Sequence, residues 1–281
     1  MIVYLNGKFL PIEEACISVL DRGFIFGDGV YEVIPVYGRK IFRLQEHLQR
    51  LDNSLNNIRL PNPLTWVQWE EALTSLVIKN QGDDQSLYLQ VTRGPAKREH
   101  HFPSHTHPTV LMMSESVETK PVPTGAKAIT CQDTRWQYCD IKAITLLPNV
   151  LSRQQAIDVG AVEAILVRNN EVMEGAASNV FIVQQGVAIT PPKSQFILPG
   201  ITRDLILEIM QSAQLPFRED NISVTQLFGA EEVWLTSSIR EILPIVMLDN
   251  KLIGTGQPGP IWSQVWQLYQ TYKKQLRNAT K

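Results

Sequence analysis

The sequence predicts a two-domain protein of the α/β class with α+β character. Strand patterns alternate irregularly with a few helices, and the chain contains no internal repeat or low-complexity segment. A stretch with two prolines and a glycine, residues 118–127, separates two series of periodic segments. We therefore expect a smaller domain at 1–118, a linker at 119–125 and a larger domain at 126–281.

The first domain is expected to begin in a sheet. An Asn6-Gly7 pair between two short alternating segments is typical of a two-residue hairpin turn. Apolar residues spaced along one helix face predict the first helix. In chain order, the expected elements are a hairpin at 3–10, a hairpin at 29–42, helices at 43–55 and 64–81, and strands at 86–94 and 108–117, which flank a polar, histidine-rich loop at 95–107.

The second domain is expected to mix hairpins with longer helices. Gly160 suits the end of a helix, and Asn169-Asn170 separates two alternating strands. In chain order, the expected elements are a strand at 128–136, a helix at 149–160, hairpins at 161–175 and 178–192, a helix at 200–214, a strand at 230–238 and an amphipathic helix at 261–278.

Composition favours a small-molecule partner. The 281 residues carry 26 basic and 28 acidic side chains, so no strong net charge indicates nucleic acid, an acidic membrane surface or a polyanion. The three cysteines, Cys16, Cys131 and Cys139, show no CxxC spacing, which argues against a disulfide framework or a thiolate metal site. With no signal-like segment or membrane span in the sequence, we expect a soluble, cytoplasmic protein.

Lys142 lies within residues 135–149, a stretch whose pattern suggests a buried strand followed by a turn. Its ammonium group could reach solvent or pair with a carboxylate such as Asp140. Alternatively, burial could lower its pKa from about 10.4 and leave an amine able to attack a carbonyl. Lys142 by itself does not decide between these interpretations.

An anion site is a second candidate feature. Gly200 precedes Ile201 and Thr202 at the start of a helix, where free backbone N–H groups favour an anion, although an ordinary helix start has the same pattern. Arg50 could add a guanidinium, or could be a solvated helix residue. Hydroxyl donors for the same anion could come from the end of an apolar strand: Thr236, Ser237 and Ser238.

Two further residues stand at the ends of strand patterns. Glu174 leads into a run of small residues before Ser178, and it could simply be a solvated carboxylate at a hairpin end. Tyr31 follows a Gly-Asp-Gly turn and could be a core residue or could project into a cleft. The glycines at 23, 27 and 29 fit neither GxGxxG nor a P-loop, so a nucleotide site is not supported.

A histidine cluster supports a rival hypothesis. His100, His101, His105 and His107 lie within eight positions, a density that suggests metal binding. Few carboxylates accompany them, and Pro103 and Pro108 favour a loop. Alternatively, this loop could present Arg98 and His100 to an anionic substrate.

Taken in order, the motifs GDGVYE, VTRG, DIKAITLLPNVL, EGAASNVF, LPGITRD and LTSS resemble those of the fold type IV pyridoxal-phosphate enzymes. This family includes D-amino-acid aminotransferases, branched-chain aminotransferases and aminodeoxychorismate lyases. The chain is most similar to D-amino-acid aminotransferases through RGFIFGDGVYEVIPVY, VTRGPAKREHHFP and CDIKAITLLPNVLSRQQA. The resemblance implies a small N-terminal α/β domain and a larger, β-barrel-like C-terminal domain with helices, with the cofactor at their interface.

The resemblance also implies a role for each candidate residue. Lys142 would form the Schiff base with pyridoxal 5'-phosphate and shuttle a proton, and Glu174 would face the pyridine nitrogen. The substrate carboxylate would be bound by Tyr31 together with Arg98 and His100 from the partner subunit of a homodimer. The remaining cofactor-binding residues would be Arg50, Ser178, Ile201, Thr202, Ser237 and Ser238.

These expectations define one function and its alternatives. The sequence predicts transamination between a D-amino acid, such as D-alanine or D-glutamate, and a 2-oxo acid, such as 2-oxoglutarate, with no metal ion. Within the same fold the alternatives are an L-branched-chain aminotransferase, an amine transaminase and an aminodeoxychorismate lyase. From a different class, the alternative is a metal-binding protein that uses the cluster from His100 to His107.

Overall fold

A computed structural model describes residues 1–105, 107–118 and 121–278. Contacts between residues divide the chain into two compact units, the first comprising Met1–Thr119, Ile141–Thr145 and Leu276–Lys281. The second unit comprises Lys120–Asp140 and Leu146–Gln275. The linker predicted at 119–125 lies partly outside the described residues, because 119 and 120 are not among them.

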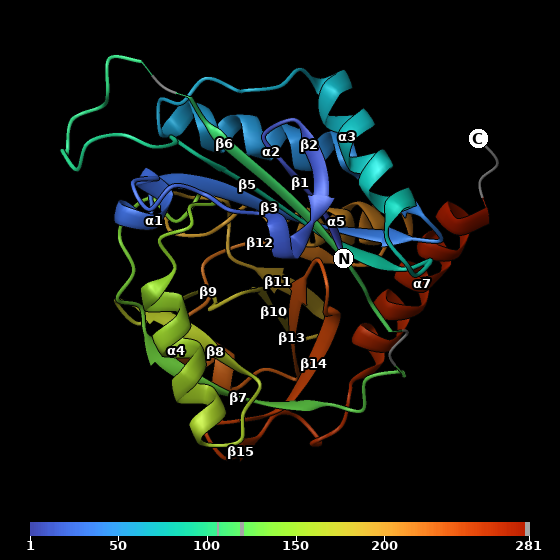
Figure 1. The fold of residues 1–281 in the computed structure, drawn as a ribbon. Helices are drawn as coiled ribbons and strands as arrows, with labels where there is room; N and C mark the ends of the chain where they lie inside the picture. The colour runs from blue at the N-terminus through green and yellow to red at the C-terminus, as the bar shows by residue number, and fades with distance from the viewer. Residues whose placement is uncertain (106, 119–120, 279–281) are drawn as a thin grey trace. The chain divides into compact units, whose positions relative to one another are not determined.

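The first unit is built on an antiparallel sheet of six strands in the order β2-β1-β6-β5-β3-β4 (Figure 1). The predicted hairpins at 3–10 and 29–42 are confirmed, and left-handed φ values of 49° and 89° at Asn6 and Gly7 form the first turn. The strands are β1 (Ile2–Leu5), β2 (Lys8–Pro11), β3 (Gly29–Tyr37), β4 (Lys40–Ile41), β5 (Gln85–Thr92) and β6 (Thr109–Ser116).

Two long helices cover one face of this sheet. They are α2 (Leu44–Asn57) and α3 (Trp66–Lys79), and both were predicted. Leu51 of α2 and Leu73 of α3 are fully buried against apolar residues of the sheet such as Ile34. The short helices η1 (Ile12–Glu14) and α1 (Arg22–Phe26) were not predicted, since neither is long enough to show a helical period.

The second unit is a mixed sheet of nine strands, with the path β12-β11-β10-β13-β14-β7-β8-β9 and β15 paired to β14. Its parallel pairs are β14 with β7, β7 with β8, and β11 with β12. The strands are β7 (Ala126–Gln132), β8 (Glu163–Arg168), β9 (Glu171–Gly175), β10 (Asn179–Gln184), β11 (Val187–Thr190), β12 (Phe217–Glu219), β13 (Glu232–Ser237), β14 (Glu241–Leu248) and β15 (Lys251–Leu252).

This sheet curls into a half-barrel. The strand at one end of the path, β9, is followed in the chain by β10. Between them the N–H of Gly175 donates to the carbonyl of Ser178 at 2.6 Å. The predicted hairpin turn at Asn169-Asn170 is confirmed by φ values of 51° and 64°. Only residues 176–178 separate the end of β9, where Glu174 lies, from the start of β10.

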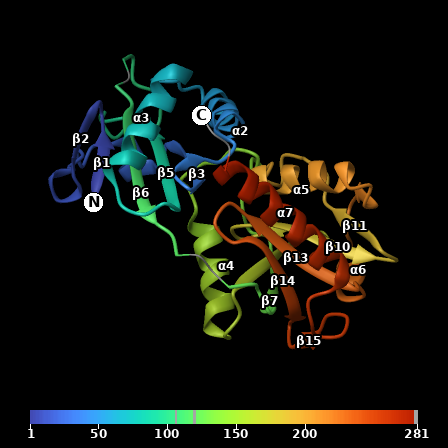
Figure 2. The same cartoon turned by 90° about the vertical axis from the view of Figure 1, so that its right-hand side faces the viewer.

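Four helices accompany the second sheet: α4 (Leu147–Asp158), α5 (Ile201–Ser212), α6 (Val224–Phe228) and α7 (Pro260–Asn278). Figure 2 shows α7 running beside β13 and β14. The carboxylate of Glu232 accepts the N–H groups of Ile261 and Trp262 at 2.9 and 2.8 Å, which caps the start of α7.

The strand predicted within 135–149 is wrong. Between β7 and α4 the chain is irregular, and one isolated bridge joins Ala143 to Val30 of β3. The apolar residues there suggested a strand, but the segment packs against β3 without forming a ladder. β14 was not predicted either, because Pro244 interrupts its pattern, although the sheet accommodates this proline opposite Trp234.

No helix in the part of the chain that the structure describes has the length and the apolar run needed to cross a membrane.

Candidate active site

The structure places Lys142 against β3 of the first unit. The N–H of Tyr31 donates to the carbonyl of Lys142 at 2.9 Å, and the N–H of Ile144 donates to the carbonyl of Gly29 at 3.1 Å. The Nζ of Lys142 lies 4.3 Å from the centre of the Tyr31 ring. Among the described residues no carboxylate forms an ion pair with Lys142, so the amine rests on an aromatic face.

A buried charge cluster lies close to this lysine in the same unit. The carboxylate of Glu32, on β3, accepts hydrogen bonds from Arg50 of α2 at 2.7 and 2.8 Å. Nδ1 of His47 lies 2.7 Å from the second oxygen of the same carboxylate. Arg50, which was predicted to bind an anion, is therefore held in one orientation by Glu32.

Burial and pairing act in opposite directions on this cluster. Burial raises the pKa of Glu32, but the charge and hydrogen bonds of Arg50 and His47 outweigh it and hold the pKa well below its usual value. Burial lowers the pKa of His47, despite the nearby carboxylate. The Nε2 atom of His47 is buried and has no hydrogen-bond partner among the described residues.

Glu32 and His47 were missed at the sequence level, although a signal was present. Glu32 stands between Val30 and Ile34 on the inward face of a strand, where a charge requires a partner. His47 and Arg50 lie three positions apart on the buried face of α2. A carboxylate in a buried strand, together with an arginine and a histidine on one helix face, indicates a buried polar cluster.

Tyr31 packs on Tyr88, with 5.8 Å between the ring centres. Arg98 and His100 are exposed on the loop between β5 and β6. No hydrogen bond, ion pair or ring contact within the described residues connects this pair to Tyr31 or Lys142. The structure thus brings Tyr31 and Lys142 together and leaves the predicted carboxylate-binding loop separate from them.

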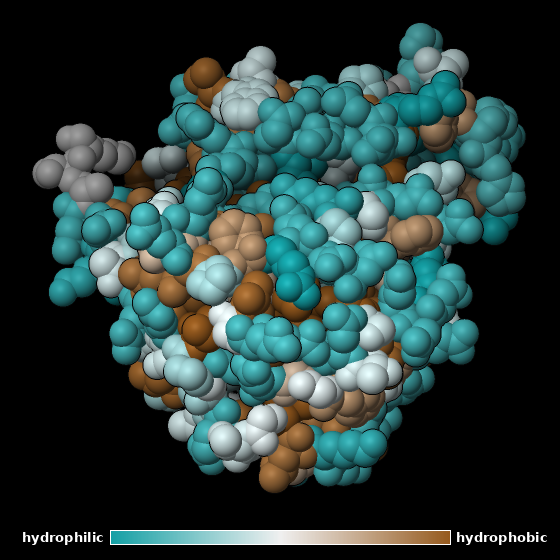
Figure 3. Space-filling model, turned by 180° about the vertical axis from the view of Figure 1, so that it is seen from behind, coloured by the Kyte–Doolittle hydropathy of each residue, from teal (hydrophilic) through white to brown (hydrophobic). Residues whose placement is uncertain are grey.

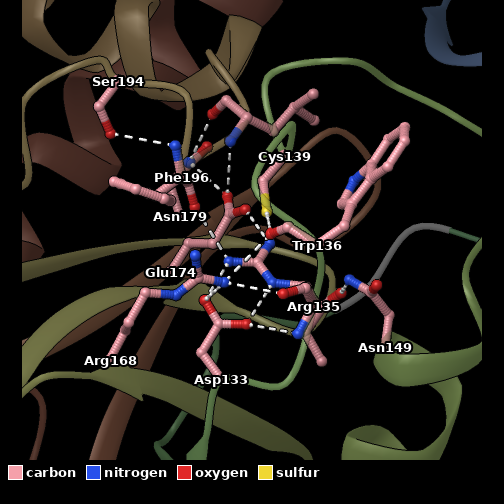
Figure 4. Close-up of polar contacts among 12 residues, drawn as sticks. Asp133, Arg135, Trp136, Cys139, Asn149, Arg168, Glu174, Asn179, Ser194 and Phe196 are labelled. Atoms are coloured by element: carbon pink, nitrogen blue, oxygen red, sulfur yellow. Dashed lines mark hydrogen bonds and ion pairs between the residues drawn. The ribbon is translucent and has the colours of Figure 1, made fainter.

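The second unit contains a buried ionic network around Glu174 (Figure 4). One oxygen of Glu174 accepts a hydrogen bond from Arg135. Its other oxygen accepts the side-chain amide of Asn179 at 3.2 Å and the N–H of Leu198 at 3.1 Å. Glu174 is therefore a buried carboxylate and not a solvated one at the end of a hairpin, because only 5% of the residue is exposed.

Arg135 is fixed in turn by Asp133. Two of its nitrogens donate to the carboxylate of Asp133 at 2.9 and 3.0 Å, and one also donates to the carbonyl of Phe196 at 3.0 Å. Arg168 pairs with Asp133 from the other side at 3.1 Å. The two arginines balance the two carboxylates, so the buried network carries no net charge.

The network sets the charge state of its members. Burial lowers the pKa of Arg135, but the hydrogen bonds to Asp133 and the charges of Glu174 and Asp133 raise it above its ordinary value. Arg135 therefore stays cationic. Burial raises the pKa of the nearby Cys139 thiol to about 11, so this thiol is neutral near pH 7.

The start of α5 lies beside the same network. Gly200 caps this helix, and within the described part of the chain no side-chain cap accepts its first N–H groups, so those of Ile201 and Thr202 suit an anion. A Cβ on Gly200 would lie 1.9 Å from the Oδ1 of Asn179, so any larger residue at this position would require the side chain of Asn179 to move. The side-chain amide of Asn179 also donates to the carbonyl of Leu198 at 2.9 Å, which joins the helix start to Glu174.

The predicted hydroxyl donors differ in their partners. The hydroxyl of Ser178 donates to the buried carboxylate of Glu163 at 3.3 Å. Ser237 accepts the N–H of Arg240 at 3.3 Å, and Ser238 follows it in the turn after β13. Thr236 is paired with Asn179 in the sheet, and its hydroxyl is buried with no partner among the described residues.

These residues fit the cofactor that the sequence resemblance implies. A buried carboxylate, Glu174, suits a protonated ring nitrogen, and the N–H groups at the start of α5 suit a phosphate. The unpartnered hydroxyl of Thr236 is a further donor next to Asn179. In the first unit, the amine of Lys142 suits an aldehyde.

No group of three or more His, Cys, Asp or Glu side chains that could hold a metal ion is found among residues 1–105, 107–118 and 121–278. The cluster from His100 to His107 includes Thr106, which lies outside the described residues.

The chain is similar to proteins of one enzyme class. Residues 29–248 match the family described as amino-transferase class IV. A D-alanine aminotransferase of Bacillus licheniformis is 39% identical over 267 residues, which cover 94% of this chain and 94% of that protein. One from Staphylococcus aureus strain N315 is 38% identical over 274 residues, covering 96% and 97% of the two chains.

Solved structures agree with this similarity. A branched-chain amino acid aminotransferase from T.th., determined with pyridoxamine 5'-phosphate, superposes with a TM-score of 0.93 at 27% identity. That match covers 99% of this chain and 95% of the other. The branched-chain amino acid aminotransferase from Escherichia coli superposes with a TM-score of 0.87 at 27% identity, covering 95% and 92% of the two chains.

We predict that His47 makes the stability of the fold depend on pH. A histidine with a lowered pKa binds its proton less readily in the folded chain, so acidification below about pH 6.5 favours the unfolded chain. The free energy of unfolding should fall by up to about 1.4 kcal/mol per pH unit between about pH 6.5 and pH 5. Urea denaturation should show a smaller fall for His47→Gln and an unchanged one for His105→Gln, an exposed control.

Glu32 acts in the same direction at lower pH. Its pKa is lowered in the folded chain, so its contribution is present above about pH 4.3 and is lost as the pH falls further. The His47→Gln variant should still lose stability below about pH 4.3, because Glu32 is unchanged in it. Equal slopes for the native protein and His47→Gln above about pH 5 would contradict the role of His47.

We predict that Arg135 and Glu174 are strongly coupled. Arg135→Met leaves a buried carboxylate without its cation and should lower the free energy of unfolding by roughly 3–5 kcal/mol. In Arg135→Met/Glu174→Gln the loss should be clearly smaller than the sum of the single losses. Arg39→Met, which breaks an exposed pair with Asp83, should cost less than about 1 kcal/mol. Additive losses in the double variant would disprove the coupling.

Proposed function

The chain belongs to the class IV aminotransferases, and from this premise we propose that it transfers an amino group from a D-amino acid to a 2-oxo acid. D-alanine or D-glutamate is the donor and 2-oxoglutarate a suitable acceptor. The observation that carries this proposal is the similarity over 94% of the chain to a protein named D-alanine aminotransferase. The buried carboxylate Glu174 supports pyridoxal 5'-phosphate as cofactor.

The cofactor, when bound, supplies an electron sink for the substrate α-carbon and carries the amino group between the two half-reactions. Lys142 is the residue that would hold the cofactor through its aldehyde, with release of water, and that would move a proton at the substrate α-carbon. Glu174 keeps a proton on the ring nitrogen, because Arg135, Asn179 and the N–H of Leu198 hold its carboxylate charged and oriented.

The phosphate group is assigned to the start of α5 and its neighbours. The N–H groups of Ile201 and Thr202 and the guanidinium of Arg50 hold it, and the orientation of Arg50 is supported by Glu32. Hydroxyl groups of Ser178, Ser237 and Ser238 complete this part of the proposal. Ser178 is its weakest member, because its hydroxyl already donates to Glu163.

Tyr31, Arg98 and His100 are assigned to the substrate carboxylate. A guanidinium with two neighbouring donors fixes both the position and the direction of a carboxylate. Once that direction is fixed, a single enantiomer points its α-hydrogen at Lys142. The position of Tyr31 beside Lys142 supports this assignment.

A homodimer, in which Arg98 and His100 serve the partner's site, is part of the proposal. Large apolar side chains are exposed in both units, among them Val19 and Phe24 in the first and Leu147 and Val159 in the second. On the face drawn in Figure 3, hydrophobic side chains are interspersed among hydrophilic ones. Single exposed apolar residues are common on protein surfaces, so the homodimer is proposed from the resemblance to D-amino-acid aminotransferases and not from these residues.

We also propose a cytoplasmic location. Cys16, Cys131 and Cys139 are all free, as is usual for proteins in a reducing compartment.

An L-branched-chain aminotransferase is the second candidate, because the T.th. enzyme of that name has the same fold at 27% identity. A panel of D- and L-amino acids with 2-oxoglutarate separates the two. We predict turnover of D-alanine and D-glutamate, measured as the oxo acid formed. Turnover of L-leucine without turnover of D-alanine would refute the proposed substrate class.

Lys142→Ala is predicted to abolish both transamination and the visible absorbance that pyridoxal phosphate acquires on binding an amine of the protein. Lys127→Ala is the matched control, since Lys127 is exposed on β7 and should leave both signals intact. A Lys142→Ala variant that still showed this absorbance would place the reactive amine elsewhere.

A further inference from the structure

A short helix, α1, and the loop between β5 and β6 are joined where β5 ends in the first sheet. Helix α1 begins after Asp21, whose carboxylate accepts the N–H of Gly23 at 2.8 Å, and it ends at Gly27 in a left-handed conformation. The loop between β5 and β6 extends on the same side of the unit as α1 (Figure 1). The N–H of Arg22 donates to the carbonyl of Gly94 at 3.0 Å, which ties α1 to the start of this loop.

Arg22 holds the backbone of the loop. Only 4% of this arginine is exposed, and its Nε pairs with Asp28 at 2.8 Å. Its terminal nitrogens reach three successive carbonyl groups of the loop, those of Glu99 at 2.6 Å, His101 at 3.4 Å and His100 at 3.5 Å. A buried guanidinium that donates to loop carbonyls fixes the path of the chain on both sides of His100.

Asp28 connects this anchor to a second arginine. Arg93 pairs with Asp28 at 2.8 and 3.1 Å and also donates to the carbonyl of Ile58 at 2.7 Å. The guanidinium of Arg93 lies 3.8 Å from the centre of the Phe102 ring. The loop is thus held beyond His100 as well, from the body of the first unit.

Phe26, the last residue of α1, contacts the two side chains that were assigned to the substrate carboxylate. Its ring centre lies 5.6 Å from the guanidinium carbon of Arg98 and 5.4 Å from the ring centre of His100. It also lies 4.8 Å from the guanidinium carbon of Arg22. One ring therefore limits the directions that two exposed, otherwise mobile side chains can take.

We propose that Arg22 and Phe26 are positioning residues for the carboxylate-binding pair Arg98 and His100. Arg22 fixes the backbone that carries the pair, and Phe26 fixes the directions of its two side chains. This inference rests on the proposed function, and it extends that function to residues that do not touch the substrate. A receptor that is rigid before binding loses less entropy when the carboxylate arrives, so loosening it weakens binding and its directionality.

The test uses Arg22→Lys and Phe26→Leu in the holoenzyme. Lysine keeps a positive charge beside Asp28 but cannot reach three carbonyls, and leucine keeps an apolar contact without a ring face. Arg39→Lys is the first control, in a surface pair with Asp83. Phe9→Leu is the second, because Phe9 also packs on an aromatic ring, Tyr4, and has a cation, Lys79, over its face.

Anchoring is measured by limited trypsin digestion. Two trypsin sites of the loop are exposed, after Lys97 and after Arg98, whereas Arg93 at its start is buried. Cleavage at these sites, followed by mass spectrometry, should be about tenfold faster in Arg22→Lys than in the native protein or in either control. An unchanged cleavage rate would show that Arg22 does not hold the loop.

Positioning is measured by kinetics. In both variants the KM for D-alanine and for 2-oxoglutarate should rise about tenfold and the preference for D- over L-alanine should fall, while cofactor absorbance and kcat change little. An unchanged KM and an unchanged D/L ratio in both variants would overturn the proposal. If the native protein shows no transamination, the proposed function fails and the positioning role fails with it, whereas the digestion still decides the anchoring.

Discussion

The ion pair between Glu174 and Arg135 is the interaction on which the second unit's site depends. A carboxylate that has lost its water keeps its charge only when a cation and hydrogen-bond donors replace that water. Arg135 supplies the cation, and Asn179 and the N–H of Leu198 supply the donors. Leu198 lies three residues before Ile201, the first residue of α5, and its carbonyl accepts the side-chain amide of Asn179, so the orientation of the carboxylate and the path of the chain into α5 depend on each other.

The first unit applies the same rule with different partners. Glu32 is fully buried and is paired with Arg50 and His47, which come from one face of α2. Here the carboxylate orients the cation, whereas in the second unit the cation orients the carboxylate. In both units a buried residue of opposite charge fixes a side chain that was predicted to bind the cofactor, so its direction is set before any ligand binds.

Local sequence signals predicted most of the fold. Asn6-Gly7 and Asn169-Asn170 predicted hairpins because their turns need residues that tolerate a positive φ, and this requirement is local. The segment around Lys142 failed because its apolar residues pack against β3, a contact with residues distant in sequence that periodicity does not reveal. The short helix α1 failed because five residues cannot display a helical period.

The candidate residues were found through the resemblance, but their partners were not. Arg135 opens the stretch that contains Lys142, and Asp133 precedes it by two positions, yet both were interpreted only as part of a strand end. Glu32 and His47 were overlooked because a single buried charge is visible in a sequence only when its partner is known. The sequence therefore indicated the groups that are proposed to contact ligands better than the groups that hold them in place.

Gly200 shows how such an arrangement constrains the evolution of the protein. Any side chain at this position would displace Asn179, and Asn179 serves both the carboxylate of Glu174 and the carbonyl of Leu198. A mutation that moves the start of α5 therefore also changes the hydrogen bond between Asn179 and Glu174, because Asn179 bonds both. A substitution at Gly200 is therefore expected to disturb the carboxylate of Glu174, although Gly200 itself contributes no functional group.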